Sequence, residues 1–272
     1  MPGPATVHRL PHPLRRATAC LPCLLLGAVL ACDRAQGSAP GSPPLPPPAW
    51  LAGAWTGTFA GTGDVVHALI LPSGACRLLN QDKLGQVAGT LALGGSALGG
   101  SGSFFLPGAL RVPSQGASAP FRFQGSAAES PAPAVRMVLV NAAHSWDMAT
   151  LQLAPDPAAA VPPRLPALAG SYTCTQTSAG VTAGLELKAD GSFSGRDEHG
   201  TFTGTLTQPD PAANALRVTL AYTLAGLRSP LVFTGLAYAR AQAEAAVSLV
   251  LMTDAGPDQY SGIFEPGRAP LP

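Results

Sequence analysis

Leu51-Ala-Gly-Ala-Trp55-Thr-Gly-Thr58 occurs a second time in the chain, as Leu168-Ala-Gly-Ser-Tyr172-Thr-Cys-Thr175. In each copy an aromatic residue follows the leucine at the fourth position, with alanine and glycine between them. An echo of this kind at a fixed distance is the sequence signature of a duplicated structural unit. The chain is therefore predicted to contain two related units, each of which opens on this stretch.

Three further pairs of segments match in the same order, at separations of about 110 to 117 residues. The pairs are Gln86–Leu91 with Thr201–Leu206, Ala119–Gly125 with Ser229–Gly235, and Val135–Val140 with Val247–Met252. The length of 272 residues agrees with two domains. We place the first repeat at 50–155, a linker rich in Pro and Ala at 156–167, the second repeat at 168–266 and a tail at 267–272.

Each repeat contains about eight short segments that are typical of β-strands, bounded by residues that favour turns. In the first repeat they cover roughly 53–60, 64–71, 75–81, 85–93, 101–106, 119–127, 134–141 and 147–154. In the second repeat they cover roughly 170–177, 181–188, 191–196, 200–207, 214–224, 230–238, 245–253 and 259–265. No long stretch has a convincing helical period, so we expect an all-β protein.

Alternation of apolar and polar residues indicates how these strands are buried. In the segment 214–224, Leu216, Val218 and Leu220 fall on one side and Arg217 and Thr219 on the other. This period of two places one face in a core and the other in water. Eight such strands fit either a closed meander or a sandwich, and closure removes exposed edges. We expect two tandem antiparallel β-barrels, with the sandwich as the alternative.

The first 31 residues have the features of a secretion signal. A basic region is followed by an apolar run over 20–30 that is too short to span a bilayer. Its end, Ala28-Val-Leu-Ala-Cys32, resembles the lipobox of bacterial lipoproteins. The resemblance implies that Cys32 is acylated, for example with palmitate, and becomes the new N-terminus. The alternative is a plain signal peptide cut near Ala31.

A tether and a membrane location follow from this resemblance. Residues 32–49 are rich in Pro, Gly and Ser and would hold the folded part roughly 50 Å from the lipid, because Pro-rich chains are extended. The protein is then expected in the bacterial cell envelope, facing the periplasm. Asp33 resembles an inner-membrane retention signal of enterobacterial lipoproteins, but inner and outer membrane both stay open.

The opening stretch of the first repeat also resembles a known group of barrels. Gly53-Ala-Trp55, on the first strand of an eight-strand unit, is similar to the motif of calycins, which include lipocalins, avidins and small bacterial protease inhibitors. The resemblance implies that Trp55 closes one end of the barrel. In the second repeat Tyr172 takes this place. No biotin-site pattern is present, so no activity of avidin is implied.

Titratable and metal-binding residues do not form a recognisable site in the sequence. His67, His144 and His199 lack metal-ligand spacing, and we expect neither a metal nor a cofactor. The stretch from His144 to Asp147 is interpreted as a turn, and Asp197-Glu198, matched with Asp82-Lys83, as a hairpin tip. With no nucleophile elbow, phosphate loop or H-E-x-x-H motif, we expect no catalytic residue and no enzyme activity.

Cys76 and Cys174 are the cysteines left in the mature chain besides Cys32. Each shares a strand face with a residue expected in the core of its own barrel. Two inward thiols in different barrels are too far apart for a disulfide, which needs about 5 to 6 Å between Cα atoms. We therefore expect buried free thiols, with a disulfide between the repeats as the alternative.

Composition and pattern together favour a binding function. A charged fraction of 11% and a net charge of +1 do not predict nucleic-acid binding. We expect interaction with an envelope protein or a protease. The alternative is a carrier of a small apolar ligand in the first barrel, where Gly94, Gly95, Gly99, Gly100 and Gly102 suggest a roomier interior. The second barrel is expected to be filled by Phe193, Phe202, Leu216, Leu220, Phe233 and Leu249.

Overall fold

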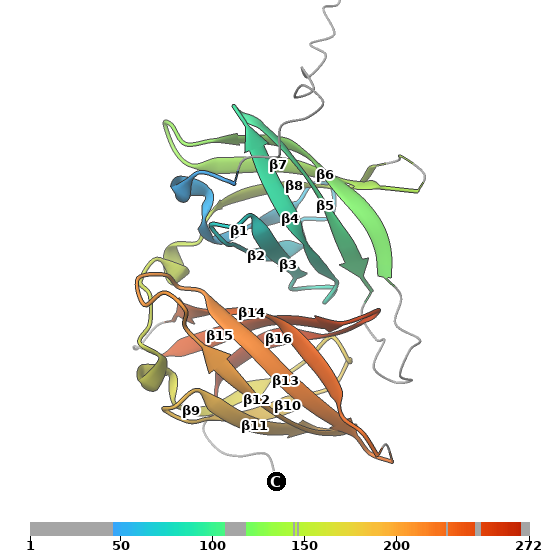
Figure 1. The fold of residues 1–272 in the computed structure, drawn as a ribbon, viewed down its shortest axis with the longest axis vertical. Helices are drawn as coiled ribbons and strands as arrows, with labels where there is room; N and C mark the ends of the chain where they lie inside the picture. The colour runs from blue at the N-terminus through green and yellow to red at the C-terminus, as the bar shows by residue number, and fades with distance from the viewer. Residues whose placement is uncertain are drawn as a thin grey trace, which may run out of the picture. The chain divides into compact units, whose positions relative to one another are not determined.

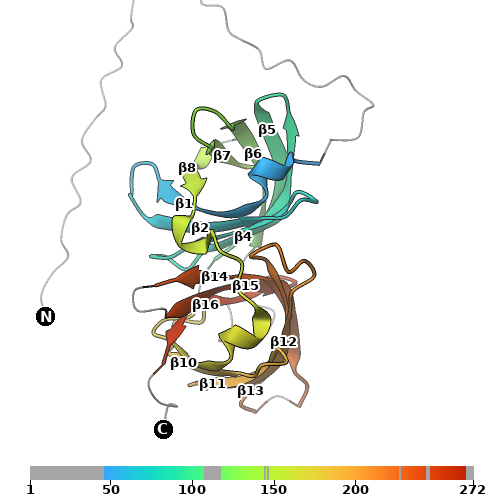
Figure 2. The same ribbon diagram turned by 90° about the vertical axis from the view of Figure 1, so that its left-hand side faces the viewer.

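The computed structural model describes residues 46–106, 118–143, 145, 147–226, 228–242 and 246–267. These residues form two closed barrels in tandem, each of eight antiparallel strands in meander order (Figures 1 and 2). The all-β fold class is thus confirmed, and closure decides against the sandwich. The predicted signal peptide, Cys32 and most of the predicted tether lie outside the described residues.

The first barrel closes between its first and last strands. Its strands are β1 (Gly53–Phe59), β2 (Val65–Ile70), β3 (Ala75–Asn80), β4 (Gln86–Gly94), β5 (Ala97–Phe105), β6 (Ser118–Ala128), β7 (Ala134–Asn141) and β8 (Asp147–Pro155). Each strand pairs with the next, and β1 pairs with β8 so that Trp55 lies opposite Pro155.

The second barrel has the same strand order with a shorter closing ladder. Its strands are β9 (Gly170–Cys174), β10 (Ala183–Leu187), β11 (Ser192–Asp197), β12 (Gly200–Thr207), β13 (Leu216–Leu224), β14 (Leu231–Ala241), β15 (Val247–Ala255) and β16 (Asp258–Pro266). Strand β16 pairs with β9 only at Glu265 and Pro266. Beyond this ladder, the loop after β9 pairs with β16 in place of a strand. There the Ser178 N–H donates to the Ser261 carbonyl over 2.8 Å.

The duplicated opening stretch forms the closed end of each barrel. A short 3-10 helix, η1 (Ala49–Leu51) or η4 (Leu165–Leu168), precedes the first strand. The Trp55 indole N–H donates to the Leu51 carbonyl over 2.9 Å, and the Tyr172 hydroxyl donates to the Leu168 carbonyl over 2.7 Å. Both leucines are buried. The stretch therefore joins a helical turn, a buried leucine and an aromatic residue into one lid.

The glycine of this stretch has a backbone reason to be there. Gly53 has a φ of 135° and Gly170 a φ of 155°. Residues with a side chain rarely adopt such angles, whereas glycine does so without steric cost. The glycine turns the chain from the helical turn into the strand, which places the aromatic side chain over the leucine carbonyl.

Strand pairing also gives the correct match between the repeats, which differs by two residues from the sequence match in both β6 and β7. Gly89 of β4 pairs with Gly102 and then Phe121, while Gly204 of β12 pairs with Leu220 and then Phe233. The counterpart of Phe233 is therefore Phe121, not Phe123. Because side chains in a strand alternate with a period of two, this shift leaves every residue on its correct face, so the sequence pattern could not reveal it.

The lid hydrogen bond should contribute measurably to stability. Replacement of Tyr172 by Phe is expected to lower the free energy of unfolding by about 1 kcal/mol, because the buried Leu168 carbonyl loses its donor. Tyr238→Phe is the matched control, since the buried Tyr238 hydroxyl has no hydrogen-bond partner among the described residues. That change should be neutral or stabilising. Urea denaturation of both variants tests this, and equal losses would contradict the assignment.

Candidate functional site

The interior of the first barrel is filled where the glycines suggested space. Gly100 points inward, but a Cβ there would lie 3.1 Å from the ring of Phe123. At Gly89 the corresponding distance to the same ring is 3.0 Å. Phe121 packs edge-on against Phe123 with ring centroids 4.6 Å apart. These glycines make room for aromatic rings, so they no longer argue for a ligand cavity.

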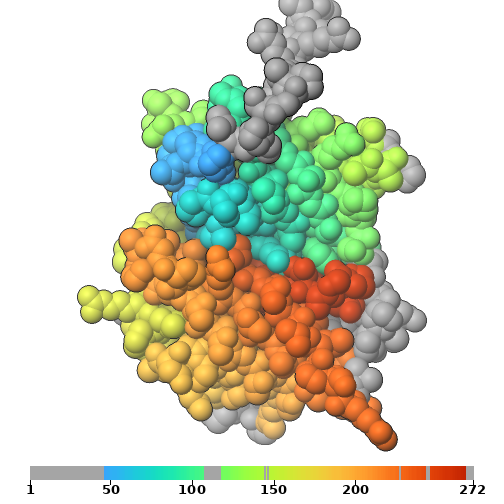
Figure 3. Space-filling view, in the orientation of Figure 1, coloured from blue at the N-terminus to red at the C-terminus, as the bar shows by residue number. Residues whose placement is uncertain are grey.

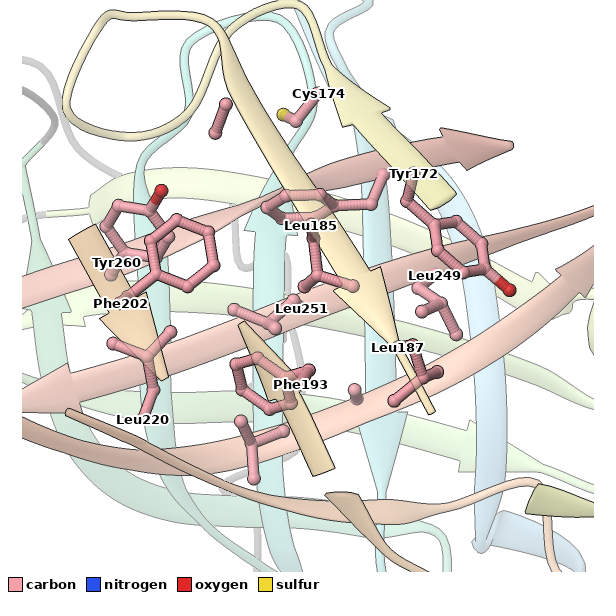
Figure 4. Packing of buried hydrophobic residues seen from close by; sticks show 14 of the residues in the cluster. Tyr172, Cys174, Leu185, Leu187, Phe193, Phe202, Leu220, Leu249, Leu251 and Tyr260 are labelled. Carbon is pink, nitrogen blue, oxygen red and sulfur yellow. The ribbon is translucent and has the colours of Figure 1, made fainter. Parts of the chain in front are cut away.

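The interior of the second barrel is aromatic, as predicted. Phe193, Phe202, Leu220, Phe233 and Leu249 all belong to its core, and Leu216 does as well. Figure 4 shows the rings of Phe202 and Tyr260 beside each other, and their centroids are 5.4 Å apart. No gap for a ligand separates these rings.

Asp197 ties the strands together at the end of the second barrel opposite the lid. Its carboxylate accepts hydrogen bonds from the Tyr222 hydroxyl over 2.5 Å and the Tyr260 hydroxyl over 3.1 Å. The backbone N–H groups of His199 and Gly200 also donate to it, over 2.8 and 3.0 Å. Burial and the nearby carboxylate raise the pKa of both tyrosines. The Asp197 carboxylate is thus occupied by four hydrogen-bond donors and has no open position for a substrate. We therefore assign the cluster a structural role.

The first barrel has a simpler version of the same turn. The Asn80 side-chain oxygen accepts hydrogen bonds from the N–H groups of Asp82 and Lys83, each over 2.9 Å. Asp197 likewise accepts from the N–H groups two and three residues after it. Strand pairing makes Asn80 the counterpart of Asp197. The sequence match of Asp197 with Asp82 is therefore wrong, because the hairpin of the first barrel is two residues longer.

The two cysteines lie in separate cores as free thiols. Burial raises the pKa of Cys76 to about 12 and that of Cys174 to about 11. A thiol is nucleophilic only as the thiolate, so neither cysteine is suited to covalent chemistry at neutral pH. Among the described residues, no group of His, Cys, Asp and Glu is arranged to hold a metal ion.

His67 lies on the outer wall of β2, not inside the barrel. It is 1% exposed, and its Nε2 lies 2.8 Å from Gln81 Oε1. An ion pair is nearby, in which Arg240 Nε donates to Asp156 Oδ2 over 2.7 Å. His199 lies in the turn after β11, and His144 lies outside the described residues. The two described histidines, His67 and His199, thus lie in different barrels.

His67 is buried because the two barrels pack against each other within one compact unit. Leu69 and Leu79 of the first barrel belong to one apolar cluster with residues of the linker and the second barrel. The other buried members are Ala159, Leu236, Tyr238, Val250 and Met252. Gln259 of β16 also donates to the Leu84 carbonyl over 3.1 Å. This interface was not predicted from the sequence. The apolar residues of β2, interrupted only by His67, were a usable signal, since strands buried on both faces lose alternation.

The faces that form this interface differ from their counterparts in the other repeat. By strand pairing, Leu69 corresponds to Glu186 and Leu79 to Arg196. On the other side, Val250 corresponds to Arg136. Apolar residues thus occupy the packed faces and charged residues the equivalent unpacked ones. The equivalent faces therefore lack the apolar residues that the packed faces bury.

A groove of about 470 Å³ runs along the seam between the barrels and is the best candidate for a binding site. One side comes from β13 and β14 and the other from β3, β4 and the turn between β2 and β3; Figure 3 shows β3 and β4 in blue-green beside β13 to β15 in orange. Its polar lining residues are Ser73, Arg77, Arg217, Thr219 and Thr234. We call it the seam groove. Its residues come from both repeats and share no motif, so the sequence could not reveal it.

One arginine of the seam groove is already paired. Arg77 forms an ion pair with Asp254. Burial lowers the pKa of Arg77 to about 10, so the side chain is still a cation at neutral pH. The exposed Arg217 has no ion-pair partner among the described residues. The groove therefore offers one guanidinium to a ligand.

No protein-family model matches the chain, and a search of curated proteins finds no similar sequence. Among the described residues, no helix is long and apolar enough to span a bilayer.

The buried His67 should make stability depend on pH. Burial lowers its pKa below the ordinary value of 6.5, and Arg240 acts in the same direction. The unfolded chain then binds more protons, so the free energy of unfolding should fall as the pH drops from about 7.5 to 5.5. In His67→Gln this part of the fall should be absent. Urea denaturation across this range measures it, and an unchanged slope in the variant would refute the prediction.

Proposed function

We propose that this protein is a non-catalytic binding protein of the bacterial cell envelope that contacts a protein partner through the seam groove. The observation that carries the proposal is the contrast between filled barrel interiors and an outer groove with polar and apolar lining residues. A barrel that carries a ligand needs internal space, whereas a protein partner needs a rigid outer surface. The two packed barrels supply such a surface.

We also propose that the barrels are calycin-like. The meander of eight strands and the Gly-x-aromatic motif on the first strand support this. A further support is the aromatic side chain that donates to a helical turn at the closed end, which occurs in both repeats. Among calycins, a protease inhibitor fits this chain better than a ligand carrier, because both barrel interiors are filled by core residues. The proposal therefore includes a protease as a possible partner.

A lipid anchor on Cys32 is the proposed means of attachment. The lipobox-like Ala28-Val-Leu-Ala-Cys32 and the Pro-rich stretch after it support this. Lipidation would hold the protein at the inner or outer membrane, with the barrels facing the periplasm.

Changing Cys32 to Ala should remove the anchor, because acylation requires the thiol. We expect the wild-type protein in the membrane fraction of a bacterial host and the variant in the soluble or unprocessed fraction. Intact mass of the wild type should exceed that of the polypeptide from Cys32 by the mass of the acyl groups. A wild-type protein cut near Ala31 without added mass would rule out the lipid anchor.

Site-specific photocrosslinking in intact cells tests the partner. A photoreactive residue at the exposed Thr219, in the seam groove, should crosslink to a distinct protein. The control position is the exposed Ser126 on β6 of the first barrel, which does not line the groove. The same product from both positions, or none from Thr219, would contradict a binding role of the groove. Native mass spectrometry would detect a retained small apolar ligand, the outcome that would favour a carrier instead.

A further inference from the structure

We infer that the seam groove recognises a carboxylate, presented by an acidic segment of the protein partner. The inference rests on the proposed function and adds the chemistry of the ligand. Its starting point is Arg217, which lines both the seam groove and an adjoining hollow of about 210 Å³. The guanidinium is therefore placed where the two spaces meet.

The charges around Arg217 leave its guanidinium available. Asp254 is engaged by Arg77 across the seam. Asp210 lines the adjoining hollow, but its carboxylate accepts from the N–H of Ala212 in its own turn over 2.9 Å. No described acidic residue forms an ion pair with Arg217. A carboxylate from outside would therefore meet a guanidinium that no described acidic residue holds in an ion pair.

Hydroxyl groups beside Arg217 complete a site for an oxyanion. Thr219 lies two residues along β13 on the same face, and Thr234 lies directly opposite it on β14. Both side chains line the groove, and neither hydroxyl is engaged by another described residue. Ser73 adds a third hydroxyl from the facing turn. A guanidinium with hydroxyl donors at its side is a set that binds carboxylates through charge-assisted hydrogen bonds.

The remaining lining is apolar, which favours a peptide segment over a free ion. Leu71 and Leu236 line both spaces, and Ala75 and Ala88 line the groove beside Arg77. An acidic side chain could reach Arg217 while an apolar neighbour contacts the two leucines. The combination of one cation, three hydroxyls and an aliphatic wall fits a segment in which acidic and apolar residues are adjacent.

A peptide titration tests the inference. The probe is a capped peptide of alternating Glu and Leu, and its counterpart has Gln in place of every Glu. Added to the isotope-labelled chain, the Glu peptide should shift the amide signals of Thr219 and Thr234 in a saturable way. The Gln peptide should leave them unchanged. Arg217→Ala should weaken binding of the Glu peptide about tenfold or more, since hydrogen bonds to charged groups are strong.

Matched variants make the test decisive. Arg122→Ala removes an exposed arginine from β6, outside the groove, and should leave the affinity unchanged. Thr219→Val should weaken binding while the exposed position keeps the fold intact. Equal affinities of the Arg217 and Arg122 variants, or equal binding of the two peptides, would overturn the inference.

The inference and the proposed function can fail separately. A partner that crosslinks to Thr219 while the Glu peptide does not bind would leave the function standing and remove the carboxylate. Saturable binding of the Glu peptide without any cellular crosslink would support carboxylate recognition and refute the protein partner. Binding of free acetate as tight as the peptide would contradict recognition of a segment.

Discussion

The closed end of each barrel is held by the hydrogen bond between an aromatic side chain and the carbonyl of the leucine four residues before it. Trp55 makes this bond in the first barrel and Tyr172 in the second. The bond holds a 3-10 turn over one end, so the inward residues below it are sealed from water. An indole and a phenol can both do this, because each has a donor at the end of a flat apolar ring. The two repeats therefore keep the geometry with different residues.

The interiors of the two barrels are filled by different residues. In the first barrel, inward glycines let Phe121 and Phe123 lie across the axis. The second barrel uses larger residues at several of these places, with Leu220 in the position of Gly102. It then closes its far end with Tyr222 and Tyr260 on Asp197. Both solutions leave little internal space, which directs the search for function to the outer surface and to the seam.

Packing between the barrels is what creates the candidate site. Apolar residues at outward positions, such as Leu69 and Val250, bury one face of each barrel. Their counterparts Glu186 and Arg136 are exposed and keep the equivalent faces polar. Along the rim of the buried area the walls diverge, and Arg77 and Arg217 from different repeats line one groove. The groove thus exists only because the duplicated unit packs asymmetrically.

The sequence by itself determined the duplication and the strand content, because these depend on local alternation and on one repeated stretch. The closing role of Trp55 was implied only by the resemblance of Gly53-Ala-Trp55 to calycins. The sequence also indicated correctly that Cys76 and Cys174 lie in separate cores. It could not determine the strand register, since a shift of two residues keeps every side chain on its face, as Phe121 and Phe123 demonstrate. Only the tertiary structure decided which outward faces meet. That choice places Thr219 and Ser73 on the two sides of one groove, and no local pattern records such a pairing of residues so far apart in the chain.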